Sequence, residues 1–566
     1  MDTSKLALDR RTFVAGAAAA TVALAGTTAA AQAAESAKAD KAAASAKAEA
    51  PAGADATETC DVVVCGCGAS GFMAAYTAAK DGAKVIVVEK GEDMTAPNGV
   101  WVSGPFAVGT DVLQNKEGGT TLTVDDAFTH VMDYTHWTPN PALARRCLVE
   151  SHNAVANLEE IGYEFKEANF RFETPFHGEK GGFHLITTPI EDRVTLWSDA
   201  LANVGAEVLF STAMTSLVTT GDAVTGIMAK AADGSTLRID AKAVIIATGG
   251  YLGNEDLQER FLHTRDLNVA RGGTSLCTGD GILAAEAVGA ALEKTFGYCP
   301  CEYGGTNDKA SRPAKQDKFD QNYAFKFGYY GNLLVDAEGK RFLNEGLLCD
   351  YPMSYGSEQT LHNNPWYAIV DQTYVDAMTT EGLYDYMTAR GAVPGDQDDP
   401  STNWFIGNYF KDRVLDKLPE DIEEGIAEGW LWKGDTIEEV AEKAGLPVEN
   451  VVATVERYNG YCETGVDEEF GTSPWYLSPV KDGPFYITQN YQSAWSTFGG
   501  LRIDDQCRVL AAETYLPIDG LYCVGTEAGS LYYSPYYDIP GYCYGLCIDS
   551  GYIAATEACA YAGVTA

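Results

Sequence analysis

One segment near residue 60 constrains the fold more than any other part of the chain. Residues 61–71 read DVVVCGCGASG, so that Gly66, Gly68 and Gly71 form the pattern G-x-G-x-x-G. The apolar run over 61–65 predicts a buried strand that leads directly into this turn. In such a turn the first glycine permits a tight bend, the second lets the backbone approach a pyrophosphate, and the third lets a helix lie close to the strand.

The residues after the glycine turn complete a β-α-β unit. We expect a helix from Ser70 to about Lys80, and residues 84–88 predict a second strand that ends in Glu89. The helix N-terminus would face an anionic pyrophosphate, and a carboxylate at this distance from the glycines suits a ribose hydroxyl. The dinucleotide-binding residues predicted in this unit are Gly66, Gly68, Ala69, Ser70, Gly71, Glu89 and Lys90.

Three further segments favour a flavin over a nicotinamide cofactor. Residues 243–250 read AVIIATGG, residues 272–281 read GGTSLCTGDG, and residues 520–529 read GLYCVGTEAG. As a set they resemble the FAD-dependent fumarate reductase and 3-ketosteroid dehydrogenase superfamily, over roughly residues 59–566. The resemblance implies FAD as the cofactor. The additional FAD-binding residues that it implies are Ser103, Gly104, Thr248, Gly249, Gly250, Asp280, Gly281, Glu527, Cys543 and Tyr544.

The resemblance also implies the domain organisation. The expected fold class is α/β: a Rossmann-like FAD-binding domain, formed by residues 59–300 and 484–566, with an inserted α+β capping domain at 301–483. The inserted region has its own composition, with loops rich in Asp, Pro and Trp. A capping domain of this kind closes over a substrate.

The first residues predict export rather than folded structure. Arg10 and Arg11, followed by Phe13 and an apolar stretch rich in Ala and Gly, resemble a twin-arginine signal peptide over residues 1–33. An uncleaved helical anchor is the alternative, and the weak hydropathy of this stretch disfavours it. Residues 34–58 consist almost entirely of Ala, Lys, Glu, Ser, Asp, Gly and Pro. They cannot bury enough apolar surface to fold alone and are expected to be a disordered linker. We therefore expect the protein in the periplasm or on the extracytoplasmic face of the cell membrane.

The charge of the chain excludes one class of partner. The chain has 40 Lys and Arg against 80 Asp and Glu, a formal net charge of −40. Nucleic-acid binding depends on neutralising phosphates with cations, so we expect no nucleic-acid partner. The spacing of the cysteines matches no zinc-binding or haem-attachment motif, so no metal site is predicted.

The candidate active site lacks the cations of a fumarate reductase. The superfamily motif R-F-x-N-E-x-x-x-R-D corresponds to residues 341–350, where Cys349 replaces the proton-donating arginine. Ser496 replaces the histidine of the H-T-M-G-G motif, and Asp538 falls near the position of a carboxylate-binding arginine. Burying a dicarboxylate without such partners is costly. Fumarate is therefore not the expected substrate.

The C-terminal residues resemble the ketosteroid dehydrogenase branch instead. Its Tyr-x-x-x-Gly element corresponds to Tyr537 and Gly541. In that branch, the tyrosine hydroxyl and the glycine N–H polarise a ketone oxygen, which stabilises enolate-like charge. A second acid or base must exchange the proton at the α-carbon. Tyr351 is the first candidate for it, ahead of Tyr355 and Cys349.

These features predict an FAD-dependent oxidoreductase that acts on a carbon–carbon bond conjugated to a carbonyl. The preferred interpretation is an ene-reductase of a largely uncharged, steroid-like enone, with electrons from an external donor such as a membrane cytochrome or a quinol-linked protein. Two alternatives stay open within this chemistry: a 3-ketosteroid dehydrogenase, and a reductase of an unsaturated acid such as an aryl acrylate, with Arg312 or Lys326 facing the pocket. The alternative of another class is a flavin electron-transfer protein.

Two further interpretations concern single residue types. His177 and His184 flank a glycine-rich segment, and we expect them at the surface rather than at the site. Cys543 and Cys547 lie four residues apart near the expected flavin. We interpret them as small buried side chains, with a redox dithiol as the alternative.

Overall fold

The computed structural model describes residues 53–117, 119, 122–167, 182–263, 269–305, 323–350, 356–391, 413–533, 536 and 539–564. The predicted export signal and most of the predicted linker lie outside these residues, as do Tyr351 and Tyr537. Among the described residues, no helix is long and apolar enough to cross a membrane.

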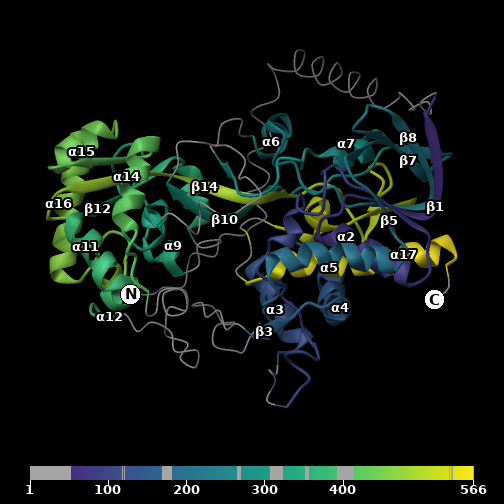
Figure 1. Cartoon of the computed structure of the whole chain (residues 1–566), viewed down its shortest axis with the longest axis horizontal. Helices are drawn as coiled ribbons and strands as arrows, with labels where there is room; N and C mark the ends of the chain where they lie inside the picture. Colours follow the sequence, from purple (N-terminus) through teal and green to yellow (C-terminus); the bar gives the residue numbers. More distant parts are fainter. Residues whose placement is uncertain are drawn as a thin grey trace, which may run out of the picture. The chain divides into compact units, whose positions relative to one another are not determined.

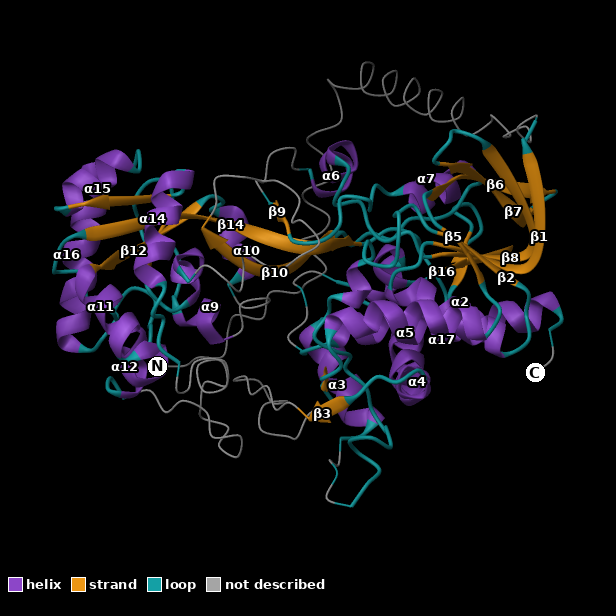
Figure 2. Cartoon of the chain, viewed as in Figure 1, coloured by secondary structure: helices purple, strands orange, loops and turns teal. Residues whose placement is uncertain are grey.

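The larger sheet is a mixed sheet with a parallel centre that contains the predicted β-α-β unit (Figures 1 and 2). Its strands, in hydrogen-bonding order, are β15 (Arg508–Leu510), β16 (Pro517–Cys523), β8 (Thr236–Ile246), β1 (Ala56–Cys65), β2 (Val85–Val88) and β5 (Glu207–Leu209), and β6 (Thr212–Thr220) and β7 (Ala223–Ala231) extend it as an antiparallel hairpin. The strands β16, β8, β1, β2 and β5 run parallel to one another. Their apolar residues are buried on both faces, as expected for a parallel sheet covered on both sides.

The predicted linker ends earlier than residue 58, because β1 already begins at Ala56. Residues 56–60 pair through their backbone with β8, from Leu237 to Ala241. The Asp55 carboxylate accepts a hydrogen bond of 2.8 Å from the Thr236 backbone N–H. Backbone pairing of this kind requires no apolar side chains, so the composition of the segment does not reveal it.

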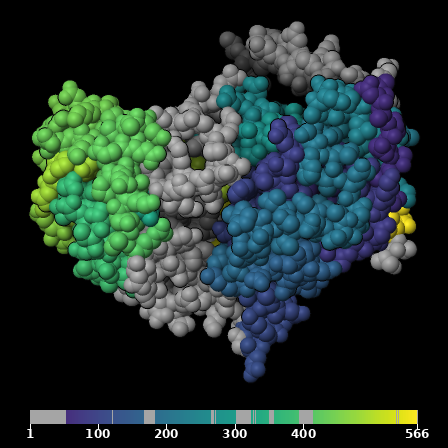
Figure 3. All heavy atoms as spheres, viewed as in Figure 1, coloured from purple at the N-terminus to yellow at the C-terminus, as the bar shows by residue number. Residues whose placement is uncertain are grey.

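Helices also belong to the part of the molecule that contains the larger sheet. They are α2 (Ala69–Lys80), α3 (Val124–Tyr134), α4 (Pro141–Glu160), α5 (Ile190–Asn203), α6 (Glu255–Leu262), α7 (Asp280–Ala287) and α17 (Tyr542–Ala562). The helices α2 and α17 cross at close range, since a Cβ added to Gly551 would lie 2.4 Å from the Ser70 carbonyl oxygen. Phe72 of α2 stacks on Trp197 of α5 with ring centroids 4.2 Å apart. On the face shown in Figure 3, the part of the chain coloured purple to teal lies at the surface, and little of the yellow C-terminal segment is visible.

A second, mostly antiparallel sheet has its own hydrophobic clusters. Its strands are β10 (Gly297–Gly305), β14 (Phe485–Phe498), β12 (Trp366–Asp371) and β11 (Leu333–Val335), with β13 (Leu431–Gly434) and β9 (Ala270–Arg271) also paired to β14. The helices of this part are α9 (Gly346–Asp350), α10 (Ser357–His362), α11 (Gln372–Thr380), α12 (Gly382–Thr388), α14 (Leu418–Glu428), α15 (Ile437–Lys443) and α16 (Val448–Thr464). The α/β class with a Rossmann-like sheet and a second α+β part is therefore confirmed, whereas the boundaries at 300 and 484 stay predictions.

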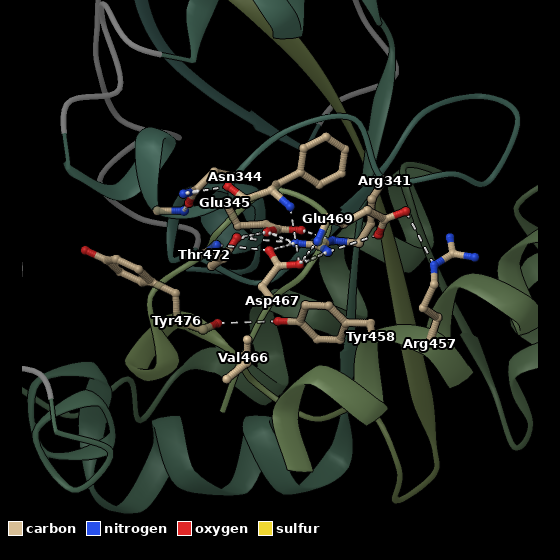
Figure 4. Close-up of polar contacts among 12 residues, drawn as sticks. Arg341, Asn344, Glu345, Arg457, Tyr458, Val466, Asp467, Glu469, Thr472 and Tyr476 are labelled. Atoms are coloured by element: carbon tan, nitrogen blue, oxygen red, sulfur yellow. Dashed lines mark hydrogen bonds and ion pairs between the residues drawn. The ribbon is translucent and has the colours of Figure 1, made fainter. Parts of the chain in front are cut away.

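The R-F-x-N-E motif has a structural role in this second part (Figure 4). The guanidinium of Arg341 is fully buried and forms a bidentate pair with Glu345, at 2.8 and 2.7 Å. It forms a second bidentate pair with Asp467, with both bonds at 2.9 Å. The ring of Tyr458 lies 5.2 Å from the guanidinium. Arg341 and Glu345 are the first and last residues of the motif, and their ion pair fixes the backbone directly before α9.

The prediction that His184 lies at the surface is wrong. His184 is in β4 (His184–Ile186), which pairs with β3 (Phe165–Glu167), and its side chain is fully buried. Its Nδ1 donates to the Gly182 carbonyl oxygen at 2.7 Å, and its Nε2 lies 2.7 Å from the Thr110 hydroxyl. Burial lowers the pKa of the imidazole to about 4. A neutral imidazole satisfied by two local partners needs no solvent, so polarity alone is a poor guide to its position.

The low pKa of His184 makes the stability of the fold depend on pH. In the unfolded chain the imidazole takes up a proton below about pH 6.5, and in the folded chain only below about pH 4. Acid therefore favours the unfolded state, and stability that is present above pH 6.5 is lost as the pH falls toward 4. We expect this group to remove about 2 kcal/mol from the free energy of unfolding between pH 7.5 and 5.

The measurement is urea unfolding of the wild type and of His184→Asn at pH 7.5 and pH 5. The variant should be less stable at pH 7.5 but should lose less stability than the wild type on acidification. The control is His152→Asn at an exposed position, which should keep the pH dependence of the wild type. Equal pH dependence in the wild type and His184→Asn would contradict the assignment.

Candidate active site

The glycine turn between β1 and α2 has the geometry that its sequence predicts. Gly66 has a φ of +102°, and a Cβ there would lie 2.2 Å from the Ala247 carbonyl oxygen. A Cβ on Gly71 would lie 2.0 Å from the Gly66 carbonyl oxygen, so this residue permits the close approach of helix and strand. Gly68, in contrast, faces open space, with no atom within 4 Å of an added Cβ. The turn therefore leaves a backbone surface that an anionic group can approach.

Glu89 closes the turn from the end of β2. Its Oε2 accepts a hydrogen bond from the Cys67 N–H at 2.7 Å, and its Oε1 accepts one from the Gly91 N–H at 2.6 Å. The carboxylate is thus held between two backbone segments, where a ribose hydroxyl can reach its remaining lone pairs. The neighbouring Lys90 pairs with Asp280 at 3.0 Å.

Glu527 joins the C-terminal part of the chain to the turn that follows β8. It is fully buried, accepts from the Thr248 hydroxyl at 2.8 Å, and accepts from the Gly249 N–H at 3.0 Å. Burial raises the pKa of this carboxyl to about 8. The Gly281 N–H donates to the same Thr248 hydroxyl at 3.0 Å. One acidic side chain thus organises three segments that lie far apart in the sequence.

Most of the predicted cofactor residues line one cavity of about 280 Å³. Those that do are Gly66, Gly68, Ala69, Ser70, Glu89, Lys90, Ser103, Gly104, Thr248, Gly249, Asp280, Cys543 and Tyr544. Gly71, Gly250, Gly281 and Glu527 lie behind this lining and shape it through the contacts of their backbones or side chains. A direct contact of Glu527 with a ribityl chain stays a prediction.

The predicted catalytic residue Gly541 lines the same cavity. It is the N-cap of α17 with a φ of +75°, and its carbonyl oxygen accepts from the Phe106 and Gly545 N–H groups, both at 2.9 Å. A Cβ at this position would lie 2.6 Å from the Gly104 carbonyl oxygen. The chain therefore requires glycine here, and the positive end of a buried helix faces the cavity.

The other predicted catalytic residues cannot be placed in the same way. Tyr351 and Tyr537 lie outside the described residues, as do Asp538, Tyr355 and Arg312. Cys349 belongs to α9, but its side chain is not among those described. The side chain of Lys326 is not described either. Ser496, which replaces the expected histidine, does line the cavity, and its hydroxyl donates to the Thr497 carbonyl oxygen at 3.0 Å.

Several lining residues were missed at the level of sequence. Phe183, Trp495 and Cys299 all line the cavity. Cys299 reaches it because β10 pairs antiparallel with β14, which sets Cys299 opposite Ser496. No motif surrounds these residues, and a pairing across almost two hundred residues leaves no local signal.

The residues present fit an FAD. The open surface at Gly68, the fixed carboxylate of Glu89 and the N-terminus of α17 all border one cavity. They suit a pyrophosphate, a ribose and an electron-rich ring edge in turn.

Comparison with known proteins agrees with this assignment. The family described as FAD binding domain matches residues 61–542. The chain belongs to this family. It is 32% identical over 516 residues to a vinyl phenol reductase of Lactiplantibacillus plantarum, covering 89% of this chain and 97% of that protein. It is 30% identical over 394 residues to a 3-oxosteroid 1-dehydrogenase of Mycolicibacterium smegmatis, covering 64% of this chain and 61% of that protein.

Among solved structures, the fold is similar to the open conformation of a flavocytochrome c3 fumarate reductase. The TM-score is 0.63 at 22% identity, over 93% of this chain and 81% of that chain. The resemblance to the fumarate reductase and ketosteroid dehydrogenase superfamily is thus confirmed. The protein is an FAD-dependent oxidoreductase acting on CH–CH bonds.

The geometry of Glu89 predicts the effect of its amide analogue on FAD binding. The Glu89 carboxylate accepts hydrogen bonds from two backbone N–H groups. In Glu89→Gln, one of these N–H groups must face an amide NH₂, which cannot accept a hydrogen bond. The amide is also a weaker acceptor than the carboxylate for a ribose hydroxyl of FAD, a difference of about 1–3 kcal/mol in binding. We expect the Kd for FAD to rise roughly 10- to 100-fold.

The measurement is a titration of apoprotein with FAD, followed by flavin fluorescence. The control is Glu92→Gln, the same change at an exposed position three residues along the chain, which should bind FAD like the wild type. An unchanged Kd in Glu89→Gln would show that this carboxylate does not support the cofactor.

Proposed function

We propose that this protein is an ene-reductase that adds a hydride and a proton across a double bond in a largely uncharged, ring-bearing enone. The observation that carries the proposal is Gly541, a glycine N-cap at the start of a buried helix in the wall of the FAD cavity. The similarity to a protein named for reduction of a vinyl phenol supports a neutral, conjugated substrate.

The N-terminus of α17 favours negative charge beside Gly541. The partial positive charge at this helix end stabilises an anion within the first turn. A substrate carbonyl oxygen placed there becomes more negative as the β-carbon accepts a hydride, so the helix stabilises the transition state more than the ground state. Bound FAD supplies that hydride. The hydroxyl of Tyr537 is proposed as the second donor to the same oxygen.

The remaining lining supports a neutral substrate. Phe183, Trp495 and Tyr536 provide apolar surface. The charged side chains of the described lining are Glu89, Lys90 and Asp280, which belong to the dinucleotide end of the cavity, and the lysine is paired with Asp280. An anionic substrate would have to be buried against this lining with its charge poorly compensated.

Proton transfer to the α-carbon is assigned to Tyr351. The segment that leads to it begins at Arg341, whose paired carboxylates fix the start of α9 (Figure 4). A neutral phenol is easily buried and can donate a proton in an apolar pocket. This assignment rests on the position of Tyr351 in the chain, two residues past the cysteine that replaces the arginine of fumarate reductases.

Two other functions use the same site. A 3-ketosteroid dehydrogenase would run the reaction in the opposite direction, and the similarity to a 3-oxosteroid 1-dehydrogenase favours this second candidate. A reductase of an aryl acrylate would need a cation supplied from outside the described lining. An electron-transfer flavoprotein would have no use for a donor beside the flavin.

The experiment is anaerobic reoxidation of the reduced holoenzyme. The flavin is photoreduced, single compounds are added, and recovery of the flavin absorbance is followed. The panel contains a Δ4-3-ketosteroid, a vinyl phenol, an aryl acrylate and fumarate. We expect the neutral conjugated compounds to reoxidise the flavin and fumarate to leave it reduced. Reoxidation by fumarate would contradict the proposed site, and no reoxidation by any compound would contradict the reductive direction.

The proposed role of Tyr537 is tested in the same assay. Tyr537→Phe keeps the ring and removes the hydroxyl, so the reoxidation rate should fall roughly 100- to 1000-fold, as for loss of one oxyanion donor. The same change at the exposed Tyr515 serves as the control and should leave the rate unchanged. An unchanged rate in Tyr537→Phe would leave Gly541 as the donor and remove the tyrosine from the mechanism.

We also propose that residues 1–33 direct export by the twin-arginine route and that an external protein, of the membrane cytochrome or quinol-linked kind, supplies electrons. The support is the pair Arg10 and Arg11 ahead of an apolar stretch. This route carries folded proteins, which suits an enzyme that must bind FAD before it leaves the cytoplasm.

Export is tested by replacing both arginines. The double variant Arg10→Lys, Arg11→Lys keeps the charge, and we expect it to accumulate inside the cell with its FAD bound, whereas the wild type is exported. Cell fractionation with an immunoblot and a flavin assay measures this. The control is Lys5→Arg, which should be exported normally. Export of the double variant would contradict the twin-arginine assignment.

A further inference from the structure

Three thiols meet in the wall of the FAD cavity. Cys299 comes from β10, whereas Cys543 and Cys547 come from the first turns of α17, and all three line the cavity. Cys299 is buried, and the other two are partly exposed. The mechanism proposed above uses none of them. Three redox-capable side chains in contact beside a redox cofactor therefore need a function of their own.

Cys543 is the centre of this thiol cluster. Hydrogen bonds from Cys299 and then from Cys547 hold the pKa of its thiol well below its ordinary value; burial opposes them, and the hydroxyls of Tyr536 and Tyr532 add to them. The Tyr532 hydroxyl lies 3.9 Å from the Cys543 sulfur and 3.4 Å from the Cys547 sulfur. Cys543 is also the second residue of α17, where the helix favours a thiolate.

The neighbouring thiol behaves in the opposite way. The hydrogen bond with Cys543 raises the pKa of Cys547, and burial raises it further. The cluster therefore sets one thiol with a lowered pKa, Cys543, beside Cys547, whose pKa is raised. An acidified thiol with a second thiol in contact is the arrangement found in redox-active cysteine pairs.

Helical spacing disfavours Cys547 as the partner of Cys543 and leaves Cys299, whose thiol forms a hydrogen bond with Cys543. Cys543 and Cys547 are one helical turn apart, where Cβ atoms are separated by about 5–6 Å. That is wider than the spacing of about 3.5–4.5 Å in a disulfide. Cys299 belongs to a different element, opposite Ser496 in the sheet, so its direction of approach to Cys543 is not set by the helix.

We propose that Cys299 and Cys543 form a redox-active dithiol in the wall of the FAD cavity, a second two-electron centre that exchanges electrons with the bound flavin and with small thiols or disulfides. In oxidation, the two thiols release two protons and two electrons, and one S–S bond forms between them. The oxidised flavin takes up both electrons with a proton, and the other proton passes to solvent. In reduction by an external dithiol, the S–S bond breaks and the two thiols regain their protons.

The first test counts the electrons that the holoenzyme accepts. Holoenzyme is treated with oxidised glutathione, desalted, and titrated anaerobically with dithionite. A disulfide takes two electrons in addition to those of FAD, so the wild type should need twice the reductant that Cys299→Ser and Cys543→Ser need. Cys462→Ser, in α16 outside the cluster, is the matched control and should need as much as the wild type. A wild type that is fully reduced by one equivalent per FAD would overturn the proposal.

The second test asks whether the thiols communicate with the flavin. The holoenzyme is photoreduced, oxidised glutathione is added anaerobically, and the flavin absorbance is followed. Recovery should occur in the wild type and in Cys462→Ser, and it should slow at least tenfold in Cys543→Ser. Equal rates in all three proteins, or no recovery in the wild type, would overturn the exchange with FAD.

Peptide mapping of the oxidised wild type requires no variant and covers the case in which a serine variant fails to bind FAD. A cross-linked pair that contains Cys299 and Cys543 supports the proposal, whereas a link between Cys543 and Cys547 contradicts the choice of partner. None of these measurements involves an unsaturated substrate, so their outcome is independent of the proposed reductase activity.

Discussion

The structure depends on one close crossing of backbone at the carboxyl ends of β1 and β8. Gly66, Gly71 and Ala247 approach so closely that a single added Cβ would lie about 2 Å from a carbonyl oxygen. This crossing brings the glycine turn, the end of β2 and the turn after β8 to one edge of the sheet. Ligands of open α/β sheets bind at this edge, because the loops there diverge and leave backbone N–H groups free. The FAD cavity is a direct consequence of that crossing.

Buried polar groups then connect distant segments to this edge. Glu527 binds the turn after β8 through Thr248 and Gly249. His184 links the Thr110 hydroxyl to the Gly182 carbonyl oxygen. In the second part of the molecule, Arg341 does the same for α9 and the loop at Asp467. Each group is fully buried and has its hydrogen-bonding partners, which is the condition under which buried polarity adds specificity without a large loss of stability.

The cavity wall combines elements that come from far apart in the sequence. The N-terminus of α17 and the glycine turn are separated by more than four hundred residues, yet both line one cavity with β10 and β14. The cavity wall therefore contains both Gly541, at the N-cap of α17, and the thiols of Cys543 and Cys547 in the first turns of the same helix. One short helical segment thus serves the proposed carbonyl chemistry and the proposed thiol chemistry, because a helix N-terminus stabilises an oxyanion and a thiolate for the same electrostatic reason.

The sequence by itself determined the β-α-β unit, the FAD site and the α/β class, because a glycine turn between a buried strand and a helix is a local pattern with few physical solutions. The resemblance to the ketosteroid dehydrogenase branch also pointed to Gly541, and the structure adds that a Cβ at this position would clash with Gly104. The tertiary structure alone decided the burial of His184, the contact of Cys299 with Cys543, and the position of Glu527 behind the cavity rather than in its lining. These features arise from strand pairing and helix packing between residues up to several hundred positions apart. Such contacts depend on how buried surfaces fit together, and no local pattern of residues encodes that fit.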